Sequence, residues 1–217
     1  LPPLTITPLE FEIGTVRHEL KLELTETSTG LAGSLEYKTD LFEATTIATM
    51  AQHLEILLQQ MVAQPYLRLN ELVTTLPPLQ PPAQIFPSLV DLFALKVPFE
   101  QPDPIKSLEP KSSRLQLGPA LVQQLEALSQ QYQVSLEQIL QSVWHILLYR
   151  YSGQAEVLVG VTKNDPLLLA LPKPFSHIWP VLTYLDEAMS FAEVLAQLKD
   201  GSTVTEGKLH QLTQQFN

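Results

Sequence analysis

The stretch between residues 149 and 160 constrains the fold of this chain more than any other. It ends an apolar helix at Tyr149, turns at Ser152-Gly153 and opens a strand, Val157 to Gly160, that is apolar on both faces. A strand of this kind is normally buried inside a sheet that is covered on each side. The stretch therefore predicts an α/β fold in which this strand lies inside a covered sheet.

Composition restricts the class of protein and its partners. With 217 residues, of which 45% are hydrophobic and 17% charged, the chain is typical of a soluble protein with one large or two small domains. Its formal net charge of -10 argues against nucleic acid or an anionic membrane as partner, because both prefer a basic face. The absence of cysteine excludes disulfides and thiolate sites and fits the cytoplasm. A first residue of Leu rather than Met suggests a piece of a longer polypeptide.

The first segment, residues 1–76, predicts a hairpin followed by a long helix. Apolar and charged residues alternate from Val16 to Leu24, which indicates a strand with one buried face. Thr27 to Gly30 supplies a turn, after which the alternation resumes. Apolar residues then recur at every third or fourth position between Asp40 and Gln64, which predicts an amphipathic helix.

Both ends of this helix are marked in the sequence. Glu43 or Asp40 is the candidate N-terminal cap, because a side-chain oxygen there can accept an otherwise unpaired backbone N–H. Pro65 ends the helix, since proline cannot donate the next backbone hydrogen bond.

Three blocks of the first segment follow the pattern of a known family. They are FEIGT at 11–15, ELKLEL at 19–24 and GSLEYKTDLFE at 33–43. Together they look like the closing part of a condensation domain, the amide-bond-forming unit of nonribosomal peptide synthetases. His18 departs from the pattern, because the family usually places Phe ahead of an acidic residue.

Residues 77–114 read as a linker between two segments. Prolines at 77, 78, 81, 82 and 87 favour an extended, semi-rigid connection. Residues 89–103 weakly resemble the start of an adenylation domain, but the chain holds no Gly-rich loop that could cradle a nucleotide phosphate. A short amphipathic helix packed on the core is the plainer alternative, which we favour.

The second segment, residues 115–217, predicts the order helix, helix, strand, strand, helix. Proline is harmless in a first helical turn, and a capping box satisfies two unpaired donors at once. The signals, in chain order, are Pro119, the capping-box pair Ser135 and Gln138, the strands Val157–Thr162 and Val181–Asp186, and the cap Ser190.

This segment also resembles condensation domains, but from the middle of the family's sequence. The matching blocks are LLYRYSGQAEVLVG at 147–160 and SFAEVLAQLKD at 190–200, and His210-Gln211 is similar to a later His-Gln pair. The closing piece thus precedes the central piece. Either the chain joins the end of one condensation domain to a remnant of a second, or it is a rearranged half-domain in which both segments share one core. The resemblance implies the C-terminal half of a chloramphenicol-acetyltransferase-like fold, with a mixed sheet covered by helices.

Family catalysis resides in an HHxxxDG motif, whose second His acts on the attacking amine. No two histidines are adjacent in this sequence. Lys163-Asn164-Asp165 stand where the family has an Arg, and Trp179 stands where it has an Asn. We therefore assign no catalytic, cofactor-binding or metal-binding residue. A serine-hydrolase elbow and a carrier-type Gly-Ser attachment site are absent as well.

The remaining polar candidates have structural explanations. No two histidines have the i, i+4 spacing of a helical zinc pair. Glu19 and Glu23 share a strand face, and the polar side of a hairpin explains them better than acid/base work. The expected positions of the histidines are a core or edge strand site for His18, a helix rim for His53, a buried and hydrogen-bonded site for His145, a loop for His177 and the chain end for His210.

These observations predict a non-catalytic, truncated condensation-like module that serves as a spacer or docking platform. Its expected partners are neighbouring synthetase domains, a carrier protein or a tailoring enzyme. The alternative is an enzyme, the C-terminal half of an acyl or peptidyl transferase whose catalytic His comes from a missing segment or a partner chain. A third interpretation is a fragment of two modules that have no common core.

Overall fold

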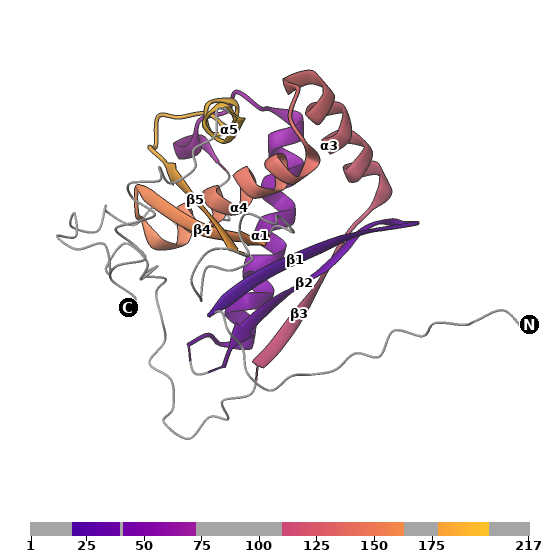
Figure 1. Ribbon diagram of the computed structural model, residues 1–217, viewed down its shortest axis with the longest axis vertical. Helices are drawn as coiled ribbons and strands as arrows, with labels where there is room; N and C mark the ends of the chain where they lie inside the picture. Colours follow the sequence, from indigo (N-terminus) through magenta and orange to yellow (C-terminus); the bar gives the residue numbers. More distant parts are fainter. Residues whose placement is uncertain (1–18, 40, 73–109, 163–177, 200–217) are drawn as a thin grey trace, which may run out of the picture.

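Four helices and two small antiparallel sheets make up the described part of the protein (Figure 1). The computed structural model describes residues 19–39, 41–72, 110–162 and 178–199. The elements are β1 (Leu20–Thr27), β2 (Gly30–Lys38), α1 (Ala44–Ala63), a short 3-10 turn (Leu69–Glu71), β3 (Pro110–Leu117), α3 (Pro119–Tyr132), α4 (Leu136–Ser152), β4 (Glu156–Thr162), β5 (Ile178–Tyr184) and α5 (Phe191–Lys199).

The predicted hairpin is confirmed, and its register gathers the apolar residues on one face. β1 and β2 pair so that Leu22 lies opposite Leu35 and Leu20 opposite Tyr37. Because successive side chains of a strand point to opposite faces, these residues share the side that packs against the helices. Leu35 and Tyr37 are buried there, whereas the other face carries charged side chains.

Two glycines make this hairpin possible. Gly30 adopts a φ of 125°, a conformation that side-chain-bearing residues rarely reach, and so closes the turn. Gly33 lies on the inner face, opposite Leu24. A Cβ atom at Gly33 would meet the Glu23 carbonyl oxygen and would come within 2.6 Å of the Leu24 Cδ2 atom.

The strand β3 was missed by the sequence analysis, and its first five residues fall in the predicted linker. Residues 110–114 are polar or proline and show no period of two. They become a strand because β2 offers them an edge: the pairing sets Leu31 opposite Leu117 and Gly33 opposite Leu115. Leu115 and Leu117 are buried on the inner face, so the linker ends before Pro110. The expected adenylation-like stretch at 89–103 lies outside the described residues.

The helix starts predicted from the sequence are confirmed in position. Glu43 occupies the N-cap position of α1, but its side chain does not make the expected capping hydrogen bond, and Pro119 is in the first turn of α3. Ser135 and Gln138 form the capping box of α4, in which the Gln138 N–H donates to the Ser135 Oγ atom at 3.1 Å. The same exchange precedes α5, where the Ser190 N–H donates to the Glu193 carboxylate at 2.7 Å.

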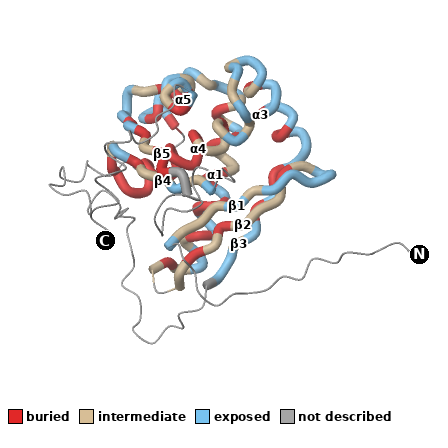
Figure 2. The backbone as a smooth tube through the Cα atoms, viewed as in Figure 1, coloured by how far each residue is buried: buried red, intermediate tan, exposed pale blue. Residues whose placement is uncertain are grey.

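One hydrophobic core is shared by the two segments. α1 packs against β2, β3, α3 and α4, and α4 also packs against β4 and α5. The buried side chains of α1, among them Ile47, Leu54 and Leu58, belong to the same cluster as Ile139 and Leu147 of α4. Figure 2 shows that buried residues concentrate along α4 and the elements that face it.

The α/β class is confirmed, but the strand that the sequence places deepest is only partly covered. β4 pairs with β5 in a two-stranded antiparallel sheet, separate from β1–β2–β3, so the described strands form two antiparallel sheets rather than one mixed sheet. Val157 is fully buried, whereas Leu158, Val159 and Val161 are half-buried and Gly160 is exposed. The prediction of an interior strand was wrong because apolar composition does not reveal how many neighbouring strands are present.

We predict that Gly33→Ala destabilises the fold, because the added methyl group meets a backbone carbonyl of β1, which cannot rotate away. Overpacking of this kind costs about 1–3 kcal/mol of unfolding free energy. Urea unfolding followed by far-UV circular dichroism measures the loss. Gly118→Ala is the matched control, because a Cβ atom there meets nothing within 4 Å. Equal stability of the two variants would contradict the described register.

Candidate functional site

Backbone hydrogen bonds form a seam where the first segment contacts the second. The chain after α1 runs alongside the loop before α5. The Leu69 N–H donates to the Met189 carbonyl at 2.8 Å, and the Ala192 N–H donates to the Pro65 carbonyl at 3.0 Å. Arg68 and Ser190 form a single antiparallel β-bridge between these two hydrogen bonds. Backbone pairing therefore holds two chain regions together that are far apart in sequence.

A buried hydrogen bond joins α1 to α4 beneath this seam. The Tyr151 hydroxyl and the His53 Nδ1 atom lie 2.8 Å apart, with the ring centroids separated by 5.9 Å. Burial raises the pKa of Tyr151 to about 12, so its hydroxyl stays protonated. The prediction of His53 as a rim residue was wrong, because α4 packs over that side of α1 and buries the imidazole.

Arg150, the basic residue of the hallmark stretch at 147–160, is also buried. Its Nη1 atom lies 3.5 Å from the Leu69 carbonyl oxygen, so α4 contacts the chain after α1 at this point. Burial lowers the pKa of Arg150, while Tyr149 and Glu187 act in the opposite direction. The helix then ends at Gly153, whose φ of 66° and N–H bond to the Tyr149 carbonyl close the last turn. Through Arg150, the hallmark stretch thus contacts the seam from the inside of the protein.

His145 lies earlier in α4 and is fully buried. Neither ring nitrogen has a hydrogen-bond partner among the described residues, which contradicts the expectation of a satisfied histidine. Burial lowers the pKa of His145 to about 3, so the imidazole is neutral at physiological pH. An imidazole that is fully buried in this way has no access to a substrate.

A shallow groove of about 490 Å³ lies on the outside of the seam. Its lining residues are Tyr66, Arg68, Ala188, Ser190, Ala192, Glu193 and Ala196. Tyr66 is 71% exposed, and the Ser190 hydroxyl is occupied by its bond to the Glu193 carboxylate at 2.8 Å. The hydrogen bonds from Ser190, together with Arg68, lower the pKa of Glu193. A carboxylate with a lowered pKa is a poor general base, so the groove offers surface for contact rather than acid/base groups.

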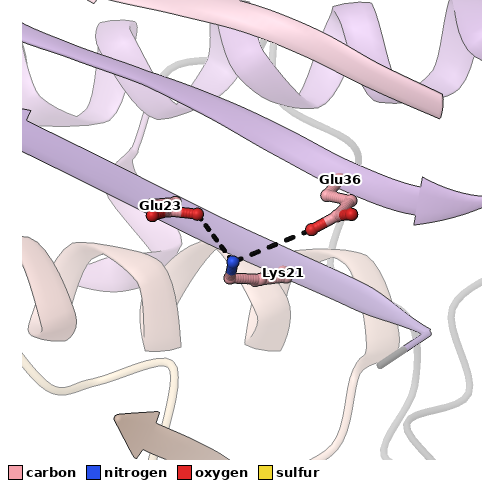
Figure 3. Close-up of polar contacts among 3 residues, drawn as sticks. All are labelled: Lys21, Glu23 and Glu36. Atoms are coloured by element: carbon pink, nitrogen blue, oxygen red, sulfur yellow. Dashed lines mark hydrogen bonds and ion pairs between the residues drawn. The ribbon is translucent and has the colours of Figure 1, made fainter. Parts of the chain in front are cut away.

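Glu23, one of the two acidic residues considered on the hairpin, is part of a surface ion-pair network with Lys21 and Glu36 (Figure 3). The Lys21 Nζ atom lies 2.6 Å from the Glu23 carboxylate and 3.7 Å from that of Glu36 on the neighbouring strand. The hydrogen bond that Lys21 donates to the Glu23 carboxylate is the main cause that raises the pKa of Lys21. Glu23 is therefore held by a lysine on the polar face of the sheet, as the sequence analysis favoured.

Several predicted positions lie outside the described residues, namely His18, Lys163-Asn164-Asp165, His177 and His210. The backbone of Trp179 is described in β5, opposite Val161, but its side chain is not. Within the described ranges, no group of three or more His, Cys, Asp or Glu side chains could hold a metal ion. None of the described helices is both long enough and apolar enough to cross a membrane.

Comparison with known proteins identifies the family. The model of the condensation domain matches residues 91–210, more than half of the chain. The chain belongs to the condensation-domain family. The match contains α4, the hallmark stretch and β4, so the resemblance seen in the second segment is confirmed.

The curated relatives of this condensation-domain chain are large synthetases. Chondramide synthase cmdD of Chondromyces crocatus is 42% identical over 72 residues, which are 33% of this chain and 2% of the synthase. A linear gramicidin synthase of Brevibacillus parabrevis is 30% identical over 121 residues, which are 54% of this chain and 2% of that synthase. The chain thus spans only a small part of the proteins that it matches. No solved structure gives a significant match.

The sequence analysis missed the residues of the seam. Leu69, Met189 and Pro65 act through backbone groups, which leave no side-chain signature. The His53–Tyr151 bond did have a signal, since a tyrosine inside an otherwise apolar helix needs a partner for its buried hydroxyl. A histidine on the facing helix is a natural candidate for that partner.

We predict that Tyr151→Phe lowers the unfolding free energy by about 1–2 kcal/mol, because it removes the buried hydrogen bond to His53 without changing the shape of the ring. Thermal or urea unfolding measures the loss. Tyr184→Phe removes the hydroxyl of a residue that is 56% exposed and should leave the unfolding midpoint almost unchanged. A Tyr151→Phe variant as stable as Tyr184→Phe would show that the bond contributes nothing.

We predict that His145 makes the fold sensitive to acid. Its pKa is about 3 in the folded state, below the ordinary 6.5, so the unfolded chain takes up a proton that the folded chain excludes. The unfolding free energy is therefore unaffected by this group above pH 6.5, and it decreases as the pH falls from 6.5 toward 3. From pH 7.5 to pH 5 the loss is about 2 kcal/mol of unfolding free energy.

His145→Leu removes the titrating group and should flatten the dependence of stability on pH over this interval. Urea unfolding of both proteins at several pH values gives the two slopes. Parallel slopes would contradict the burial of a neutral imidazole at this position.

Proposed function

We propose that this condensation-family chain is a catalytically silent, truncated module of a nonribosomal peptide synthetase. It serves as a spacer or docking platform for neighbouring synthetase domains, a carrier protein or a tailoring enzyme, in the cytoplasm. The observation that carries the proposal is the single core closed by both segments, in which α1 and β3 complete each other's packing. A core of this extent supports a folded unit that does not need a second lobe for burial of its apolar surface.

The chemistry of the described residues supports a silent module. Amide formation in this family relies on the second His of the HHxxxDG motif, and no two histidines are adjacent in this sequence. The two described histidines lie inside the protein, His53 bonded to Tyr151 and His145 within the core of α4. Neither imidazole is within reach of an amine that arrives from solvent.

The outer surface of the seam supports a role in contact. Tyr66 stands exposed beside small alanine side chains and the charged pair Arg68 and Glu193. An exposed aromatic ring with a charged rim is typical of protein contact surfaces, in which Tyr and Arg are enriched. The backbone bonds beneath the groove keep its two walls in register.

We predict that the purified chain forms no amide between an acyl-loaded donor carrier and an aminoacyl-loaded acceptor carrier above the rate without protein. Mass spectrometry of the carrier-bound products measures this, with an intact condensation domain and the same carriers as the positive control. Product formed by the chain alone would contradict the proposal.

A second set of reactions tests the transferase alternative. The upstream synthetase polypeptide is added to the same mixture. If product appears only in that mixture, at a rate above that of the upstream polypeptide alone, the chain is half of a working enzyme and the silent-module proposal fails. Direct binding of flanking domains, measured by calorimetry, is the result expected of a docking platform.

A further inference from the structure

The strand edges of the described protein differ in how they are protected. An unpaired strand edge exposes a row of N–H and C=O groups that can pair with another chain, and proteins commonly block such edges with charged residues or proline. β1 carries Lys21, Glu23 and Glu26 on its edge of the first sheet. β3, on the opposite edge, carries Pro110, Lys111 and Arg114.

The outer edge of β5 is protected in another way. The Leu185 N–H donates to the Ala155 carbonyl at 2.7 Å. This bond identifies which residues of β4 and β5 direct their backbone N–H and C=O groups toward each other. In an antiparallel pair this alternation turns the backbone groups of every second residue outward. On β5 these residues include Pro180, which has no N–H, and Tyr184. The Gln197 amide of α5 bonds both the Tyr184 N–H, at 3.2 Å, and the Tyr184 carbonyl, at 2.9 Å.

β4 has no comparable protection. The same alternation turns the backbone groups of Glu156, Leu158, Gly160 and Thr162 outward, and none of them has a hydrogen-bond partner among the described residues. Glu156 is the only charged residue of the strand and stands at its beginning. Between Val157 and Val161 the edge holds neither a charge nor a proline. Leu158 is half-buried and Gly160 exposed, so a second strand can reach this edge.

We propose that the outer edge of β4 pairs with the β4 strand of a second copy of this chain. A two-fold axis beside Val159 sets Leu158 of each copy opposite Gly160 of the other, and Glu156 opposite Thr162. All the outward backbone groups of β4 then lie in hydrogen-bonded positions, and no like charges face each other. This agreement of register and charge favours a second copy over an unrelated strand.

The assembly closes at two copies. Pairing gives a four-stranded sheet with the order β5, β4, β4, β5, and its new outer edges are the two β5 strands. Pro180 and the Gln197 cap protect both of these edges, so no third copy can add. The protection of β5 therefore prevents this four-stranded sheet from growing into a fibre.

Analytical ultracentrifugation of the full chain, from micromolar to submillimolar concentration, tests this pairing. A monomer–dimer equilibrium is expected, without larger species. Each copy carries a net charge of -10, so the dimer should become tighter as salt screens the repulsion between copies. A chain that stays monomeric throughout this range would overturn the proposal.

Matched variants locate the interface. Leu158→Lys places a charge on the open edge and should weaken the dimer by about tenfold or more. Leu182→Lys is the control, because Leu182 lies directly opposite Leu158 on the protected strand and is likewise half-buried. It should leave the dimer constant unchanged.

Gly160→Pro removes one outward N–H without touching the ladder to β5 and should act like Leu158→Lys. Circular dichroism confirms that each variant is folded. A dimer unaffected by both edge variants would overturn the proposal. So would a monomer that instead forms a complex with a neighbouring synthetase polypeptide through this edge, because a different strand would then occupy it.

Discussion

The packing of α1 against α4 is the contact on which the rest of the structure depends. α1 comes from the first segment and α4 from the second, so this contact joins the two segments. α1 supplies Leu54, Leu57 and Leu58 to the cluster that Ile139, Val143 and Leu147 of α4 complete. The buried His53–Tyr151 bond fixes how the two helices face each other, because an unmade hydrogen bond in a core is costly.

The sheet repeats this dependence. The hairpin β1–β2 has one apolar face and needs cover, and β3 extends the sheet while bringing Leu115 and Leu117 into the same core. Since β3 leads directly into α3 through Pro119, its register on β2 also positions the helices of the second segment. The two segments therefore close around one interior.

Much of this fold can be predicted from local signals in the sequence. The hairpin follows from the alternation up to Tyr37 and from Gly30, and the helix starts follow from Pro119 and the Ser135–Gln138 pair, because each of these acts within a few residues. β3 could not be predicted in this way. Its polar residues form a strand only because β2 offers an edge far away in sequence. The partial exposure of β4 could not be predicted for the same reason, because the apolar composition of the strand does not show how many strands flank it.

The candidate site shows the same division. The absence of a His pair can be read from the sequence, and so can the resemblance that names the family. The seam could not be predicted, because Leu69, Met189 and Pro65 pair through backbone atoms. The protection of β5 by Gln197 requires a loop to return α5 alongside the strand, which only the tertiary structure reveals.

Cleavage of the chain between its two segments is the most direct test of the shared core. A protease site placed between Pro82 and Ala83 separates the first segment from β3 and all that follows. The account predicts that the two cut pieces remain together in size-exclusion chromatography without denaturant and unfold in one transition. Elution as two separately folded pieces would contradict the shared core and, with it, the account of this chain as one unit.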